Sequence, residues 1–133
     1  MSAAPVVPTL SVVYAKDIQK VAAFYRRTLS LAVLEEEQNF VVVGNAGYEI
    51  AVVRMADSIA RATQISVPPV VREDTPIKCS FWVENLQSVK MEAEAAGGAT
   101  KPLSSAWSWR GQLHLDGHDP EGNVVQFRTS AAR

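Results

Sequence analysis

The sequence predicts an α+β fold in which two copies of one strand–helix–strands unit form a curved mixed sheet, with the helices on its outer face. Two observations predict it. A helix N-cap residue follows a strand-like run twice, at Asp17 and Asn85, which lie 68 positions apart. Each cap precedes a helical pattern and then several strand-like runs, so the pattern repeats although the residue identities do not. An internal duplication explains both observations.

The length of the chain limits the number of domains. With 133 residues it is long enough for one domain with a hydrophobic core and too short for two. The alternative is an unduplicated α+β domain such as a ferredoxin-like fold. The number of strand-like runs after each helix argues against that alternative.

The first unit begins with a strand at 9–15, which is rich in β-branched residues. Asp17 then caps an amphipathic helix whose apolar face consists of Ile18, Val21, Ala22, Tyr25 and Leu29. Three strand-like runs follow, at 31–37, 39–44 and 48–54, and the turn residues Asn45, Ala46 and Gly47 separate the last two.

Residues 55–77 interrupt the pattern. Three prolines and a charged run in SVPPVVREDTP exclude a regular element there, although residues 59–63 fit a short helical turn. The segment is therefore either a connector between the two units or a lid over a site.

The second unit repeats the order of the first. A strand is predicted at 78–83, and Asn85 caps a helix with Leu86, Val89, Ala93 and Ala96 at helical spacing that stops at Gly97-Gly98. Strand-like runs follow at 105–111, 112–118 and 123–129. The sequence Asp119-Pro120-Glu121-Gly122 predicts a type I turn that joins the last two runs as a hairpin.

Composition excludes several classes of function. The net charge is −1 and the 13 basic residues are dispersed, which argues against a nucleic-acid partner and against an anionic membrane surface. A single cysteine excludes a disulfide framework and a Cys-rich zinc site. No apolar run reaches the roughly 18 residues that span a bilayer, and residues 1–5 lack signal-peptide features. These features predict a cytoplasmic protein.

Three segments carry a resemblance to a known family. They are YAKDIQKVAAFYRRTLSL (14–31), WVENLQSVKMEAEAAGG (82–98) and DPEGNVVQF (119–127). Together they resemble the glyoxalase/bleomycin-resistance/dioxygenase proteins of the vicinal oxygen chelate superfamily. One departure is Ser30, where that family usually has glycine.

The resemblance implies a single domain over 1–133 with paired βαβββ modules. Module one covers about 6–54, the connector 55–77 and module two about 78–130. It also implies a cup-shaped ligand site, a homodimer, and a divalent metal held by His, Glu or Gln side chains that project into the cup.

Alternation along the predicted strands assigns side chains to the cup, because successive residues of a strand face opposite sides. The more polar or mixed sets face the cup and the apolar sets face the helices. The candidate ligand-binding residues are Leu10, Val12, Tyr14, Glu49, Lys78, Ser80, Trp82, Trp107, Trp109, Gln126 and Arg128.

The family's metal positions fall, by the resemblance, on Leu10, Lys78, Gln126 and either Glu49 or Ala51. Leu10 has no donor atom, and the ammonium group of Lys78 repels a divalent cation. Glu49 and Gln126 alone supply two oxygen ligands, too few for a protein-held metal. The sequence therefore predicts no metal and no cofactor.

Three roles for Lys78 remain open. It forms an ion pair with Glu49 across the cup, it holds an anionic or carbonyl group of a ligand, or it lies in solvent at the sheet end. The tryptophans Trp82, Trp107 and Trp109 have two alternatives, which are core or dimer packing and a stacking surface for a flat ligand.

The remaining polar candidates are weaker. His114, Asp116 and His118 share one face of a strand, but neighbours on a face lie about 7 Å apart, which is long for a shared ion. That face is instead expected to meet solvent or a dimer partner. Cys79 is expected to be a small core residue on the helix side.

These observations favour a metal-free protein that binds a partly aromatic or anionic small molecule in the cup. The alternative is a lyase, isomerase or dioxygenase of the same superfamily, either metal-dependent or assisted by Lys78. A purely structural or interaction role is a third possibility. The sequence identifies no catalytic residue and leaves open whether the protein is an enzyme.

Overall fold

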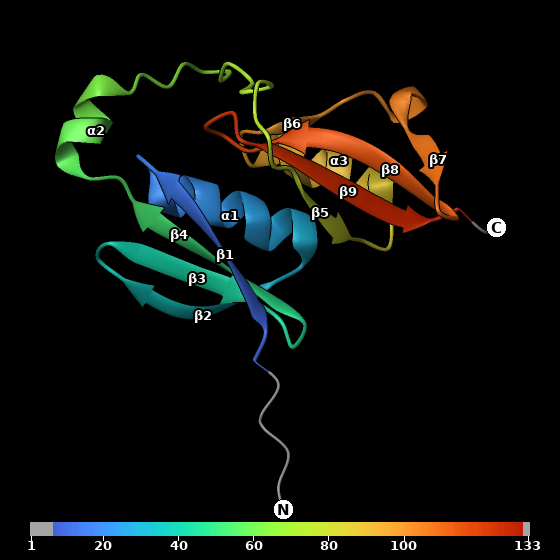
Figure 1. Cartoon of the computed structure of the whole chain (residues 1–133), viewed down its shortest axis with the longest axis horizontal. Coiled ribbons are helices and arrows are strands. Elements are labelled where there is room, and N and C mark those ends of the chain that lie inside the picture. Colours follow the sequence, from blue (N-terminus) through green and yellow to red (C-terminus); the bar gives the residue numbers. More distant parts are fainter. Residues whose placement is uncertain (1–6, 132–133) are drawn as a thin grey trace, which may run out of the picture.

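The computed structural model of the chain describes residues 7–131. Residues 1–5, on which the absence of a signal peptide is predicted, and residue 6, the expected start of module one, lie outside the described residues. The strands form a four-stranded sheet and a five-stranded sheet, and helices cover the same side of both (Figure 1). The α+β prediction is confirmed.

The first unit has the predicted order of elements. Strand β1 (Thr9–Ala15) is followed by helix α1 (Ile18–Leu29) and by strands β2 (Ala32–Glu37), β3 (Phe40–Gly44) and β4 (Tyr48–Arg54). The spatial order is β1-β4-β3-β2, with β1 parallel to β4 and the other pairs antiparallel.

The second unit repeats this arrangement in the order β5-β9-β8-β6, with β7 also paired to β8. Strand β5 is parallel to β9, as β1 is to β4, so the predicted duplication is confirmed at the level of topology. Two very short elements in this unit, β6 and η1, are too short for a periodic pattern to predict. The elements are β5 (Cys79–Trp82), α3 (Leu86–Ala95), β6 (Ala99–Thr100), the 3-10 turn η1 (Leu103–Ser105), β7 (Trp107–Trp109), β8 (Gln112–His118) and β9 (Val124–Ser130).

The expectation of one continuous curved sheet is wrong. Strands β1 and β5 are the facing edges of two separate sheets, and no strand ladder joins them within residues 7–131. The Oγ atom of Ser11 and the Sγ atom of Cys79 lie 4.0 Å apart across this gap. The two edges therefore approach each other without exchanging backbone hydrogen bonds.

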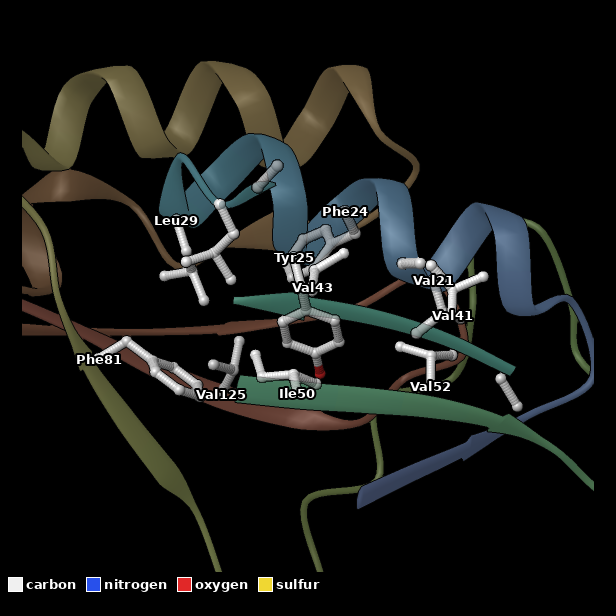
Figure 2. Close-up of a cluster of buried hydrophobic side chains, with 14 of the residues drawn as sticks. Val21, Phe24, Tyr25, Leu29, Val41, Val43, Ile50, Val52, Phe81 and Val125 are labelled. Carbon is white, nitrogen blue, oxygen red and sulfur yellow. The ribbon is translucent and has the colours of Figure 1, made fainter. Parts of the chain in front are cut away.

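The hydrophobic core lies between the helices and the two sheets, as Figure 2 shows. Alternate residues of β4 and β9, such as Ile50, Val52 and Phe127, point into it and are fully buried. Burying one such side chain contributes about 1.5–3 kcal/mol. The intervening residues of each strand point away from the helices, toward the side predicted to be the inside of the cup. This side is left available for a site and, because it lies away from the core, is called the outer face of each sheet below.

Both predicted helix caps form. Asp17 accepts a hydrogen bond from the backbone N–H of Lys20, and Asn85 accepts one from Ser88. At the end of α1, Ser30 has φ 54° and ψ 48°, the left-handed conformation that favours glycine. The turn expected at a glycine is therefore made by a serine.

The turn between β8 and β9 links the two units. The buried carboxylate of Glu121 accepts hydrogen bonds from the backbone N–H groups of Lys16 and Asp17 at the start of α1, at 2.8–3.0 Å. The fully buried Asp119 accepts a 2.8 Å hydrogen bond from the hydroxyl of Tyr25 on the same helix. The predicted Asp-Pro-Glu-Gly turn thus also anchors α1 to the second unit.

The segment between the units contains one short helix, α2 (Asp57–Ala62), where a helical turn is predicted. After α2, hydrogen bonds attach the connecting segment to the rest of the protein at two separate places. The ammonium group of Lys16 donates to the carbonyl of Thr63 at 2.6 Å, and the N–H of Arg72 donates to the carbonyl of Gly122 at 2.8 Å. No helix in the described part of the chain is long and apolar enough to cross a membrane.

Candidate ligand-binding site

The face of the second sheet that points away from the core carries a row of aromatic and basic side chains. Trp82 on β5 pairs with Arg128 on β9, which pairs with His114 on β8, which pairs with Trp107 on β7. Residues paired across neighbouring strands point to the same face. Four adjacent strands therefore place these rings and a guanidinium group side by side.

A second row, of polar side chains, runs beside the first. Ser80 on β5 pairs with Gln126 on β9, and Gln126 pairs with Asp116 on β8. The Ser80 hydroxyl donates to Oε1 of Gln126 at 2.7 Å, and Nε2 of Gln126 donates to Oδ1 of Asp116 at 3.3 Å. Nζ of Lys78 completes the network with a 2.9 Å ion pair to Oδ2 of Asp116.

His114 joins the two rows and is almost fully buried, with 2% of its surface exposed. Its Nδ1 lies 3.0 Å from Oε1 of Gln126, and its Nε2 lies 3.1 Å from the carbonyl oxygen of Trp109. The ring also stacks against Trp107, with centroids 5.6 Å apart and an angle of 21° between the planes. These contacts fix both the imidazole and the neighbouring indole.

The three tryptophans on this face remain open to water. Trp82, Trp107 and Trp109 are exposed by 46%, 41% and 60%. Basic groups lie against two of the rings, since Nζ of Lys78 is 5.7 Å from the centroid of Trp107 and Cζ of Arg110 is 5.4 Å from that of Trp109. The surface therefore offers partly exposed indole rings, two of which have a basic group over the ring.

A cavity of about 420 Å³ adjoins the polar row. Lys78 and Asp116 line it, together with Lys101 and His118. Burial lowers the pKa of His118, the carboxylate of Asp119 opposes that shift, and the charge of Lys101 adds to it. The remaining lining residues are Val71, Glu73, Thr75, Thr100, Gly117 and Val124.

A larger cavity, of about 760 Å³, lies at the gap between β1 and β5. Its inner wall includes core residues that Figure 2 labels, among them Tyr25, Ile50 and Phe81. Of the residues predicted to bind ligand, it contains only Val12 and Tyr14. The larger cavity is thus separate from the polar network, and its volume alone does not make it the better candidate.

The segment at 71–75 forms a wall shared by the two cavities. Val71 and Glu73 line the smaller cavity, whereas Arg72 and Asp74 line the larger one, and Thr75 contributes to both. This alternation is typical of an extended chain.

The predicted site residues divide between the two sheets. Lys78, Ser80, Trp82, Trp107, Trp109, Gln126 and Arg128 share the outer face of the second sheet. Leu10, Val12 and Tyr14 lie on the outer face of β1, with Glu49 opposite Leu10 on β4. Within residues 7–131, no ion pair or side-chain hydrogen bond connects the first set to the second.

Lys78 does not form the ion pair with Glu49 that was one of its predicted roles. It pairs with Asp116, which lies on the same sheet and next to the same polar row, whereas Glu49 belongs to the other sheet. The third role, a lysine free in solvent at the sheet end, is also wrong, because its side chain is engaged with Asp116 and adjoins Trp107.

Two expectations about neighbouring residues are also wrong. His114 faces neither solvent nor an open surface, because β7 covers it with two tryptophans. Cys79 is exposed and not part of the core, since it lies on the open edge of β5 and lines the larger cavity. Its strand parity was predicted correctly, but no neighbouring strand covers it.

The side chains at the family's metal positions do not fit a divalent metal. Leu10 supplies no donor, Lys78 is a cation already paired with Asp116, and the amide of Gln126 is engaged by Ser80 and Asp116. Across residues 7–131, no group of three or more His, Cys, Asp or Glu side chains is arranged to hold a metal ion. No chemical step at this site is therefore assigned to a metal.

Sequence reasoning put His114 and Asp116 on one strand face but did not assign them, or Gln112, to the ligand site. Gln112 accepts a 3.4 Å hydrogen bond from Arg128. The signal that could have identified them is the alternation in 112–118, which puts Gln112, His114 and Asp116 on one face. The order of the strands was also needed, because it places β8 between β7 and β9.

Comparison with known proteins supports the fold. No protein-family model and no curated protein matches the sequence. Among solved structures, a glyoxalase/bleomycin resistance protein/dioxygenase family enzyme from Burkholderia phytofirmans superposes with a TM-score of 0.66 at 16% identity, covering 92% of this chain and 97% of that one.

Two other solved structures agree. The fosfomycin resistance protein FosX from Listeria monocytogenes has a TM-score of 0.63 at 12% identity, over 98% of this chain and 97% of that one. A glyoxalase/bleomycin resistance protein from Albidiferax ferrireducens has a TM-score of 0.64 at 13% identity, over 91% and 96%. The chain therefore has the fold of the glyoxalase/bleomycin resistance/dioxygenase proteins, as its sequence motifs predict.

Proposed function

We propose that this protein binds a planar, partly aromatic small molecule on the outer face of its second sheet, without a metal ion. The observation that carries the proposal is the row from Trp82 through Arg128 and His114 to Trp107. The basic groups beside the row favour a ligand that carries negative charge.

The energetics support binding at this surface. Stacking a flat ring on an indole removes apolar area from water, at about 25 cal/mol per Å². Correct aromatic geometry adds about 0.5–1.5 kcal/mol. The His114 ring, which is itself held between Gln126 and the carbonyl of Trp109, stacks on Trp107, so the indole loses little side-chain freedom on binding.

An enzyme of the same superfamily is a weaker proposal. A lysine that acts as a base must offer a free amine, and one that acts as an electrophile must direct its ammonium group at the substrate. Lys78 instead donates to the carboxylate of Asp116. No hydroxyl or thiol nucleophile in the described part of the chain has a histidine hydrogen-bonded to it. Binding is therefore the better supported function.

Two further proposals concern the surroundings of the protein. The apolar outer face of β1, which carries Leu10, Val12 and Tyr14, supports a homodimer. A cytoplasmic location is proposed from the single cysteine, which suits a reducing compartment.

Intrinsic fluorescence tests the proposed function directly, because all three tryptophans of the chain lie on the proposed surface. Naphthalene-1-carboxylate is expected to change the emission saturably, and calorimetry supplies its Kd. Cyclohexanecarboxylate, which has the same charge and no flat ring, is expected to bind about tenfold more weakly.

Trp107→Leu is expected to raise the Kd of naphthalene-1-carboxylate about tenfold. Tyr14→Leu, which alters an exposed aromatic side chain on the other sheet, is expected to keep that Kd within about twofold of wild type. A silent emission across a panel of planar aromatic acids would contradict the proposal. Stoichiometric zinc, nickel, manganese or iron in the purified protein would contradict its metal-free part.

A further inference from the structure

The cavity of about 420 Å³ beside the polar row is lined by two nitrogen-bearing side chains, Lys101 and His118, that the proposed ligand surface does not use. Lys78, Lys101 and His118 all line it. Each lysine is already paired with a carboxylate of the chain, Lys78 with Asp116 at 2.9 Å and Lys101 with Glu73 at 3.4 Å.

The two ion pairs differ in how firmly the carboxylate is held. Asp116 lies within a strand and also accepts a hydrogen bond from Gln126. Glu73 belongs to the segment between the units and holds Lys101 through one long contact, with its side chain 67% exposed and that of Lys101 57% exposed. A pair of this kind contributes little to stability and exchanges readily. Glu73 is therefore the replaceable partner of Lys101.

Lys78 connects this cavity to the aromatic surface. It lines the cavity, and its Nζ lies 5.7 Å from the ring centroid of Trp107. A ring stacked near Trp107 is thus close to Lys78 and, through it, to the cavity that Lys101 and His118 also line. Asp116 of the polar row and residues Val71, Glu73 and Thr75 of the connecting segment also line this cavity, so a short charged arm that enters it meets both.

We propose that this cavity is the subsite for an oxyanion carried by the ligand, and that the carboxylate of Glu73 occupies the place of that oxyanion when no ligand is bound. The inference rests on the proposed binding of a planar molecule and names its chemical class, an aromatic compound with a phosphate or carboxylate arm. Binding replaces the Glu73–Lys101 pair by an oxyanion between Lys101, Lys78 and His118.

The α3 helix supplies matched controls. Lys90 and Glu94 form an ion pair there, outside both cavities. Lys90→Gln removes the same charge as Lys101→Gln, and Glu94→Gln removes the same charge as Glu73→Gln. All four side chains reach the surface, so each variant is expected to fold.

The experiment compares 1-naphthyl phosphate, naphthalene-1-carboxylate and the uncharged 1-naphthol by calorimetry. Glu73→Gln is expected to lower the Kd of the two anions by about two- to fivefold, because it removes the carboxylate that competes with them for Lys101. The gain is this small because an exposed ion pair is weak. Lys101→Gln is expected to weaken them by about three- to tenfold. Both variants are expected to keep the Kd of 1-naphthol within about twofold of wild type. Lys90→Gln and Glu94→Gln are expected to leave the Kd of all three compounds unchanged. The ratio of the two anions in wild type identifies the preferred arm.

Inorganic phosphate tests the subsite without the aromatic surface. The chain has two histidines, so the imidazole protons give two sets of NMR signals. Phosphate is expected to shift those of His118 saturably in wild type and Lys90→Gln, and not in Lys101→Gln.

The outcomes separate this inference from the proposed function. If 1-naphthol binds as tightly as the anions and Glu73→Gln matches Glu94→Gln, the aromatic surface stands and the oxyanion subsite is wrong. If no naphthyl compound binds but phosphate shifts His118 in a Lys101-dependent way, the subsite stands and the aromatic surface is wrong. If no probe binds, both are wrong.

Discussion

Ser30 shows how one residue can depart from a family pattern while the backbone keeps it. The left-handed conformation there costs a residue with a Cβ atom about 1–2 kcal/mol relative to glycine. Its φ of 54° nevertheless lets the N–H of Leu31 reach the carbonyl of Arg26 at 2.9 Å, which closes helix α1. Ser30 thus differs from the family's usual glycine in its side chain, whereas the backbone makes the same left-handed turn.

Ser30→Gly is therefore expected to stabilise the protein by about 1 kcal/mol, because glycine adopts the left-handed conformation without strain. Urea unfolding measures the change, and the melting temperature should rise by about 3–5 °C. Ser30→Ala is the control, since it removes the hydroxyl and keeps the Cβ atom. Equal stability of the glycine and alanine variants would show that this conformation stores no strain.

Tyr25 gives a prediction about alkaline pH. Burial raises the pKa of its hydroxyl well above the usual value, and the charge of Asp119 and the hydrogen bond to it act in the same direction. The unfolded chain therefore loses this proton at about pH 10, while the folded protein still holds it. The stability linked to Tyr25 is complete below that pH and is lost as the pH rises toward the folded-state pKa.

Urea unfolding between pH 7 and 11 checks this dependence. Tyr25→Phe is expected to cost about 1.5–3 kcal/mol at pH 7, because the buried Asp119 loses a donor. Above pH 10 the difference between variant and wild type should shrink, while the exposed-tyrosine variant Tyr14→Phe follows wild type throughout. A constant difference over the whole pH range is the result that contradicts the assignment.

At the scale of elements, the hairpin turn between β8 and β9 does more than reverse the chain. Glu121 brings a buried carboxylate to the N–H groups of Lys16 and Asp17, just before α1, where the helix dipole also favours negative charge. One side chain of the second unit thereby supplies acceptors to the helix of the first.

Glu121→Gln is expected to destabilise the protein by about 1–3 kcal/mol, since a neutral amide has one acceptor oxygen for backbone donors that now meet two. Chemical unfolding at pH 7 measures the loss. Glu84→Gln, at an exposed position, is the control and is expected to stay within about 0.5 kcal/mol of wild type. A change in Glu121→Gln no larger than that control would remove the turn's role as an anchor.

The same scale shows why most elements were predictable. Runs rich in β-branched and aromatic residues identify β1, β3, β4 and β9, and the N-cap residues Asp17 and Asn85 locate both helices. Strand β6 and turn η1 are too short for any period. The partners of Glu121 lie more than a hundred positions away in sequence, so local pattern indicates the turn but not its contact with α1.

At the scale of the whole molecule, strand parity identified the outer-face residues of both sheets, including Lys78, Gln126 and the tryptophans. It did not predict that the sheets are separate, because alternation within a strand carries no information about the next sheet. The partner of Lys78 depends on that arrangement, which explains why Asp116 and not Glu49 pairs with it.

The arrangement of the sheets also leads to the last prediction. The outer face of β1 is apolar and open, with Leu10 and Val12 each 50% exposed, and the edges of β1 and β5 lack ladder partners among the described residues. Open strand edges and apolar faces of this kind are covered in stable proteins, commonly by a second subunit. The chain is therefore expected to be a homodimer that buries the face of β1.

Leu10→Glu places a charge on this face without entering either cavity, so it is expected to yield a folded monomer. Sedimentation equilibrium gives the mass, and circular dichroism checks the fold. Val33→Glu, on the far-edge strand β2 and similarly exposed, is the control and should remain dimeric. A wild-type protein that is monomeric at all concentrations would contradict the dimer. A Leu10→Glu variant that stays dimeric would show that the dimer does not bury the face of β1.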